Sequence, residues 1–134
     1  MVACTTSDAD RRHAGGPLRV TSAWARTADS GTTGGAYITV QNTDTLPVTI
    51  ISATSPVAQS AELHESMMHG RLAHMIARPS VVIARDSTLS MVPGGLHVML
   101  NGLTRALLVG DTLTVTLRLG DGRQVPARVA VRAP

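Results

Sequence analysis

Histidine and methionine gather in one stretch of the chain, where together they could bind a soft metal ion. Residues 64–99 hold four of the five histidines and five of the six methionines. Imidazole and thioether are neutral donors, and thioethers favour Cu(I) over Mg²⁺, Ca²⁺ or structural zinc. Methionine is also a common core filler, so each residue taken alone has a structural interpretation. The cluster as a whole indicates a metal site that needs no carboxylate ligand.

Strand geometry predicts which of these side chains share a face. A two-residue turn at His69-Gly70 would place His64 directly opposite Met75, with Cβ atoms roughly 4.5–5.5 Å apart. The same register sets His74 opposite Glu65, which we interpret as a cross-strand polar pair and not as a metal ligand. The hairpin therefore offers one imidazole and one thioether on one face.

A second His/Met pair lies within a single predicted strand. His97 and Met99 are two residues apart, so they share a face at roughly 6.5–7 Å. Val98 and Leu100 then point to the opposite, core-facing side. Met91 lies in another short strand and is interpreted as a core residue.

The elements that must position these residues are all strands. The clearest is 112–119, where Leu and Val alternate with Thr and Arg, followed by a turn at Asp121-Gly122. Pro126 in the returning strand favours an edge position. No amphipathic helix of useful length appears, so we expect an antiparallel β-sandwich or barrel. The predicted strands are 18–25, 35–42, 46–54, 60–67, 72–77, 80–84, 88–92, 96–100, 112–119 and 124–132.

Composition excludes several classes of function. The chain has 134 residues, the size of one domain, and only 16% of them are charged. The net charge of +3 comes with arginines scattered along the chain and with almost no aromatic residues. A nucleic-acid partner is therefore not expected. No apolar run is long enough to span a membrane.

The single cysteine, Cys4, limits the redox and metal chemistry. It permits no internal disulfide and no haem attachment motif, and a blue-copper centre would need a Cys thiolate beside two histidines. Val2-Ala3-Cys4 followed by polar residues is similar to the start of a bacterial lipoprotein, although the upstream apolar segment is missing. We expect residues 1–17 to form a flexible tether, lipid-anchored at Cys4 unless that cysteine is incidental, and residues 18–134 to form the folded domain.

The spacing of His64, Met75 and His97-x-Met99 resembles the signature of the PCuAC family of periplasmic Cu(I) chaperones. Further landmarks of that family extend over about residues 18–132. They are Ala23-Trp24-Ala25-Arg26, Gly35-Ala36-Tyr37, Gln41-Asn42, Glu62-Leu63-His64-Glu65, Pro93-Gly94-Gly95, His97-Val98-Met99-Leu100, Gly102-Leu103 and Gly110-Asp111.

The resemblance implies a cupredoxin-like antiparallel β-sandwich of Greek-key type that binds one Cu(I) through His64, Met75, His97 and Met99. It implies an extracytoplasmic location, in the periplasm or on the outer face of the cytoplasmic membrane. It also implies delivery of copper to the CuA centre of cytochrome c oxidase, with the CuA subunit or a Sco-like protein as acceptor. Asn101 departs from the more apolar residue that the family often has, and we expect this to matter little. A His/Met-rich tail is absent, so a second copper site is not expected.

Two other functions stay open on the sequence. The chain would be a metal-free interaction module if its methionines only fill the core. It would be a copper oxidase if the metal had an open position stable as Cu(II), which two thioethers disfavour. No Ser/His/Asp constellation is visible, so an enzyme is not expected. The Met67-Met68-His69 segment is either a landing point for incoming copper, a contact for the recipient protein, or simply an exposed turn.

Overall fold

The structure, a computed structural model, describes residues 18–69 and 71–133, without the side chains of residues 67–69, 73 and 74. The tether expected for residues 1–17, with the lipid anchor at Cys4, lies outside the described residues. Within them, no helix is long and apolar enough to cross a membrane. The chain forms ten strands: β1 (Leu18–Arg26), β2 (Gly34–Asn42), β3 (Val48–Thr54), β4 (Ala58–His69), β5 (Leu72–Ala77), β6 (Val81–Ile83), β7 (Thr88–Ser90), β8 (Leu96–Leu103), β9 (Thr112–Leu119) and β10 (Gln124–Arg132).

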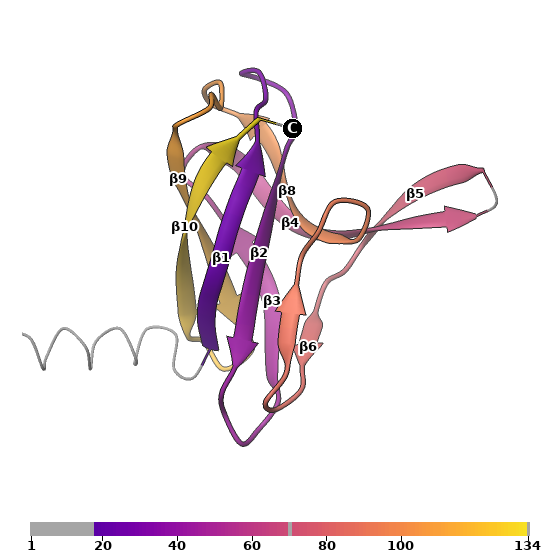
Figure 1. Ribbon diagram of the computed structural model, residues 1–134, viewed down its shortest axis with the longest axis vertical. Helices are drawn as coiled ribbons and strands as arrows, with labels where there is room; N and C mark the ends of the chain where they lie inside the picture. Colours follow the sequence, from indigo (N-terminus) through magenta and orange to yellow (C-terminus); the bar gives the residue numbers. More distant parts are fainter. Residues whose placement is uncertain (1–17, 70, 134) are drawn as a thin grey trace, which may run out of the picture.

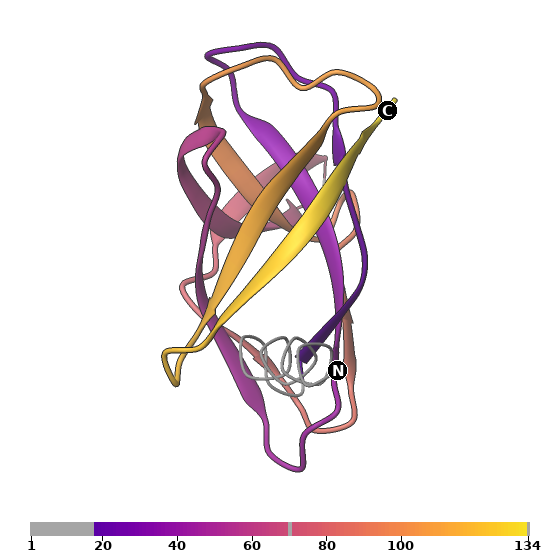
Figure 2. The ribbon, with the colours of Figure 1, turned by 90° about the vertical axis from the view of Figure 1, so that its left-hand side faces the viewer.

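The strands pair into one continuous sheet that folds back on itself (Figure 1). Its order is β5-β4-β8-β2-β1-β10-β9-β3-β6, with β7 attached to β2. An additional pairing of β3 with β4, through Ala53 and Ala61, closes the central strands into a ring. In Figure 2, β9 and β10 lie side by side across one side of this body. The predicted all-β sandwich or barrel is confirmed.

Alternating side chains fill the interior. The inward residues of β9 (Leu113, Val115, Leu117 and Leu119) are at most 5% exposed, and those of β10 (Val125, Ala127, Val129 and Val131) are equally buried. Met91 is also in the core, as predicted. Branched aliphatic side chains fill the core of this protein, which has no phenylalanine, because they pack well on a pleated surface.

The first and last strands differ from the expected pattern. β1 pairs with β10 in parallel, and this is the one parallel pairing among the described strands. β10 therefore lies between β1 and β9, and the edge position predicted from Pro126 is wrong. The contact with β1 covers only Ala130 and its two C-terminal neighbours, whereas Pro126 pairs with Thr116 of β9 alone. A proline is tolerated there because the strand has a partner on one side only at that point.

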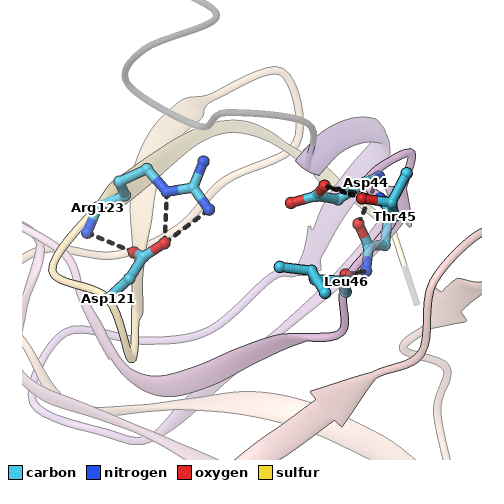
Figure 3. Close-up of polar contacts among 6 residues, drawn as sticks. Asp44, Thr45, Leu46, Asp121 and Arg123 are labelled. Carbon is cyan, nitrogen blue, oxygen red and sulfur yellow. Dashed lines mark hydrogen bonds and ion pairs between the residues drawn. The ribbon is translucent and has the colours of Figure 1, made fainter.

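Local side-chain contacts fix the turns (Figure 3). In the β9–β10 turn, Asp121 accepts hydrogen bonds from the backbone N–H of Arg123 at 2.9 Å and from its Nε at 2.6 Å. The Arg123 guanidinium lowers the pKa of the Asp121 carboxyl below its usual value. In the β2–β3 loop, Asp44 accepts a hydrogen bond from the backbone of Thr45 at 2.6 Å. Both turns lie at the same end of the body that the strands form (Figure 1).

The β4–β5 hairpin projects from the side of the body (Figure 1). The part of β4 nearest the body pairs with β8, and the distal part pairs only with β5. Leu72, Met75 and Ile76 on this hairpin are exposed because no strand covers them. The hairpin is therefore an arm that carries a thioether out to the edge of the sheet.

Candidate metal centre

Two imidazoles face each other across β4 and β8. His64 pairs directly with His97, and the ring centroids are 6.3 Å apart. The next pair on the same face is Glu62 with Met99. Val98 on the opposite face is fully buried, as expected from strand alternation. The β4–β8 ladder thus gathers three of the four predicted donors on one face.

Met75 comes from the projecting hairpin, in a register that differs from the prediction. Ser66 and not His64 lies opposite Met75, and His69 pairs with Leu72. The expected turn at His69-Gly70 is therefore wrong. A shift of two positions keeps every residue on its face, so His64 and Met75 remain diagonal neighbours at roughly 7 Å.

An ion pair accompanies the observed register. Arg78 donates through Nε to Glu65 Oε1 at 2.7 Å, and its backbone N–H bonds to the carbonyl of Leu63 at 2.8 Å. Glu65 pairs with Ile76, so Arg78 sits diagonally beside it on the same face. The predicted Glu65–His74 pair is consequently wrong.

Three of the predicted donors line one pocket of about 320 Å³. These are Met75, His97 and Met99, with Arg26, Tyr37 and Ser66 elsewhere on its wall. His97 lies at the bottom with 5% of its surface exposed, while Met75 at the rim is 59% exposed. His64 does not line the pocket, but its ring lies beside that of His97. The solvent exposure of the four residues thus ranges from the buried imidazole of His97 to the exposed thioether of Met75.

The hydrogen bonds of His97 leave one ring nitrogen available as a donor to a metal. Its Nδ1 lies 3.1 Å from the carbonyl oxygen of Gly95. Because a carbonyl only accepts, the proton is on Nδ1, and Nε2 keeps its lone pair. A backbone carbonyl on the other nitrogen is the usual way in which proteins orient a metal-binding imidazole.

His64 carries a buried nitrogen without a partner. Its Nδ1 is buried and makes no hydrogen bond, and it is the one such side-chain atom among the described residues. Its Nε2 lies 3.5 Å from Oε2 of Glu62. Leaving a buried polar atom unpaired costs about 1–3 kcal/mol, which a bound metal would offset.

An aromatic row supports His97 from the β1–β2 side. The centroid of the Tyr37 ring lies 6.2 Å from that of the His97 ring and 4.7 Å from that of the Trp24 ring. The guanidinium of Arg26 lies over Tyr37, and that of Arg132 lies over Trp24. Tyr37 therefore lies on the pocket wall beside the imidazole, and Trp24 packs against Tyr37.

Glu62 and Asn101 also lie beside the candidate donors, and the sequence pattern did not predict this. Glu62 stands two residues before His64, so strand alternation alone puts it on the same face. Asn101 donates to Glu62 Oε1 at 3.0 Å, a contact that only the β4–β8 pairing reveals. The side chains of Met67, Met68 and His69 lie outside those described.

The donor set suits a soft ion. In the part of the chain that the structure describes, no group of three or more His, Cys, Asp or Glu is placed to hold a metal. The pocket and its neighbour His64 instead supply two imidazoles and two thioethers, all neutral. Such a set matches a soft monovalent ion better than Mg²⁺, Ca²⁺ or Zn²⁺.

The sequence matches the family described as "Putative lipoprotein LpqE-like" over residues 18–131. The chain belongs to the LpqE-like family. A relative from Leifsonia xyli subsp. xyli, named "Putative lipoprotein Lxx21020", is 38% identical over 116 residues. That match covers 86% of this chain and 69% of the relative. The family match spans all ten strands except the last residue of β10.

Solved structures of copper-related domains share the fold of this LpqE-like chain. The "Copper-bound PCuAC domain from PmoF2" superposes with a TM-score of 0.75 at 25% identity, covering 90% of this chain and 97% of that one. The solution structure of "CuI-DR1885" from Deinococcus radiodurans gives a TM-score of 0.64 at 33% identity, covering 92% and 85%. The resemblance to PCuAC domains found in the sequence therefore holds for the fold, within a family that carries the LpqE-like description.

Proposed function

We propose that this chain is a Cu(I) carrier of the bacterial cell envelope. It binds one Cu(I) through His64, Met75, His97 and Met99 and passes the ion to an acceptor protein. The observation that carries the proposal is the pocket lined by three of these donors, beside the unpartnered Nδ1 of the fourth. The similar folds of a copper-bound PCuAC domain and of CuI-DR1885 support the same cargo.

The geometry suits a carrier that must release its ion. His97 is buried and oriented by Gly95, so it can serve as a fixed anchor. Met75 is exposed on a projecting strand, so its thioether can leave the ion without unfolding the body. Neutral donors around a monovalent ion leave a net charge of +1, which an acceptor richer in anionic ligands can extract.

The proposal extends to the acceptor and the location. By resemblance to PCuAC proteins, the acceptor is the CuA subunit of cytochrome c oxidase or a Sco-like protein. The location is extracytoplasmic, with residues 1–17 as a tether that Cys4 can anchor to lipid and residues 18–134 as the copper domain. The lipoprotein description of the family supports this location. We propose a carrier and not an enzyme.

Replacing Met75 or Met99 with Leu tests the thioether ligands. Leucine nearly conserves volume, so the fold should persist, whereas copper affinity should fall by about tenfold or more because a donor is lost. Anaerobic titration of Cu(I) against a chromophoric chelator measures the affinity. Met91→Leu is the matched control, since Met91 is a core methionine that does not line the pocket.

Equal Cu(I) affinity in the wild type and in both pocket variants would contradict the thioether assignment. Absence of any one-to-one Cu(I) complex in the wild type would instead favour the alternative, a metal-free sandwich that uses methionine as filler. The Met91→Leu control should bind copper like the wild type, even if its stability changes slightly.

A further inference from the structure

A chain of polar contacts runs along the face of β4 and β8 and ends at His64. Asn101 donates through Nδ2 to Ser60 Oγ at 3.3 Å and to Glu62 Oε1 at 3.0 Å. The other carboxylate oxygen, Oε2, lies 3.5 Å from His64 Nε2. Glu62 thus bridges an amide donor on one side and an imidazole on the other.

Strand register builds this row. Ser60 pairs with Asn101, and Glu62 pairs with Met99. Asn101 is therefore the diagonal neighbour of Glu62 on the same face, within side-chain reach. The Glu62 side chain is 53% exposed, so burial does not hold its carboxylate toward the imidazole. Among the described residues, the hydrogen bond from Asn101 is the contact that does so.

The two nitrogens of His64 have opposite surroundings. A carboxylate only accepts hydrogen bonds, so the contact with Glu62 is satisfied when Nε2 carries the proton. A neutral imidazole then keeps its lone pair on Nδ1, and this buried atom has no donor facing it. A proton placed on Nδ1 would instead leave a buried N–H without an acceptor. The lone pair of Nε2 would then face a lone pair of the Glu62 carboxylate, which is repulsive.

We propose that Glu62, held in place by Asn101, is a positioning residue that keeps the proton of His64 on Nε2 and presents Nδ1 to the metal. This inference rests on the proposed Cu(I) site. It makes the two imidazoles donate through different nitrogens, since the Gly95 carbonyl holds the proton of His97 on Nδ1 and leaves Nε2 for the ion. Asn101, which we expected from the sequence to matter little, thereby helps to position the site.

Nitrogen-15 NMR of the imidazoles in the metal-free protein, at a pH where both rings are neutral, tests the tautomers directly. We expect the Nε2–H form for His64 and the Nδ1–H form for His97. In Glu62→Ala, the bias of His64 toward Nε2–H should weaken, because only the buried surroundings of Nδ1 then oppose the other tautomer, whereas His97 should stay unchanged as an internal reference. An Nδ1–H form of His64 in the wild type, or an unaltered His64 in Glu62→Ala, would overturn the proposal.

Loading with Cu(I), which is diamagnetic, extends the test to the ligand atoms. The nitrogen resonances that move should be Nδ1 of His64 and Nε2 of His97. A larger shift of His64 Nε2 than of His64 Nδ1 would overturn the proposal even if copper binds normally, so its failure is distinct from failure of the proposed function. If no resonance moves because copper does not bind, the proposed function fails, while the metal-free measurement still decides the tautomers.

Affinities complete the experiment. Loss of a partner that orients a metal ligand typically costs about 10–100-fold in affinity, and we expect this for Glu62→Ala and for Asn101→Leu. Glu62→Gln keeps an acceptor oxygen and should restore part of the loss. Met91→Leu is again the control, since Met91 is a core methionine that does not line the pocket. Wild-type affinity in Glu62→Ala would contradict the positioning role.

Discussion

Replacing His97 with Asn should lower the Cu(I) affinity by more than about a hundredfold, beyond the range for an outer partner of a metal ligand. The amide nitrogen of Asn can occupy the place of imidazole Nδ1 and keep the hydrogen bond to the Gly95 carbonyl. The donor atom Nε2 is lost. His97 is the most buried of the four donors, so no water or nearby side chain can replace it easily.

Competition with a chromophoric Cu(I) chelator measures this loss, and urea unfolding checks that the variant is folded. Met91→Leu again serves as the control with normal copper binding. A Cu(I) affinity of His97→Asn within about threefold of the wild type, in a folded protein, would contradict the role of His97 as the anchor of the site.

Replacing Asn42 with Ala should lower the free energy of unfolding by roughly 3–4 kcal/mol. Asn42 is fully buried at the end of β2. Its Nδ2 donates to the carbonyls of Leu46 and Ile83, both at 3.0 Å, and its Oδ1 accepts the N–H of Asp44 at 2.9 Å. Alanine leaves the buried carbonyl of Ile83 and two part-buried backbone groups without these partners, and it opens a cavity.

Urea unfolding measures the loss, and Asp44→Ala is the control. The Asp44 side chain makes only exposed contacts with Thr45, so that variant should lose less than about 1 kcal/mol. Tyr37, the pocket residue of β2 nearest to Asn42, is five residues away along the strand, or roughly 16–17 Å. Folded Asn42→Ala should therefore bind Cu(I) normally, and a stability loss below about 1 kcal/mol would contradict the clamp assigned to this residue.

Strand identity was readable from the sequence because the side-chain period of two is local. The alternation of Leu113 and Val115 with polar residues in β9 predicts which face is buried, whichever strand pairs with β9. The faces of His97 and Val98 followed in the same way. Where each strand pairs is a non-local property, and there the sequence interpretation was weaker.

The hairpin register illustrates the limit. A turn one residue further along moves every β4–β5 pair by two positions, and the Glu65–Arg78 ion pair that favours it is invisible in a turn motif. The candidate donors survived the error because a shift of two preserves faces. The parallel pairing of β1 with β10 has no local signal either, since it joins the two ends of the domain.

The proposed copper site needed more than the pattern of donors. The spacing predicted His64 and His97 as candidates, but only the β4–β8 ladder brings their rings together. Glu62 and Asn101 looked like ordinary surface residues because they come from different strands and meet only after folding. Contacts between side chains on neighbouring strands are thus the part that sequence could not supply.

X-ray absorption at the copper K-edge of the Cu(I)-loaded protein tests the central claim most directly. The predicted spectrum is that of one Cu(I) per chain with two nitrogen and two sulfur neighbours, and with one sulfur neighbour fewer in Met75→Leu. A copper environment without sulfur, or a protein that retains no copper after removal of free ion, would contradict the assignment of His64, Met75, His97 and Met99 as a Cu(I) site.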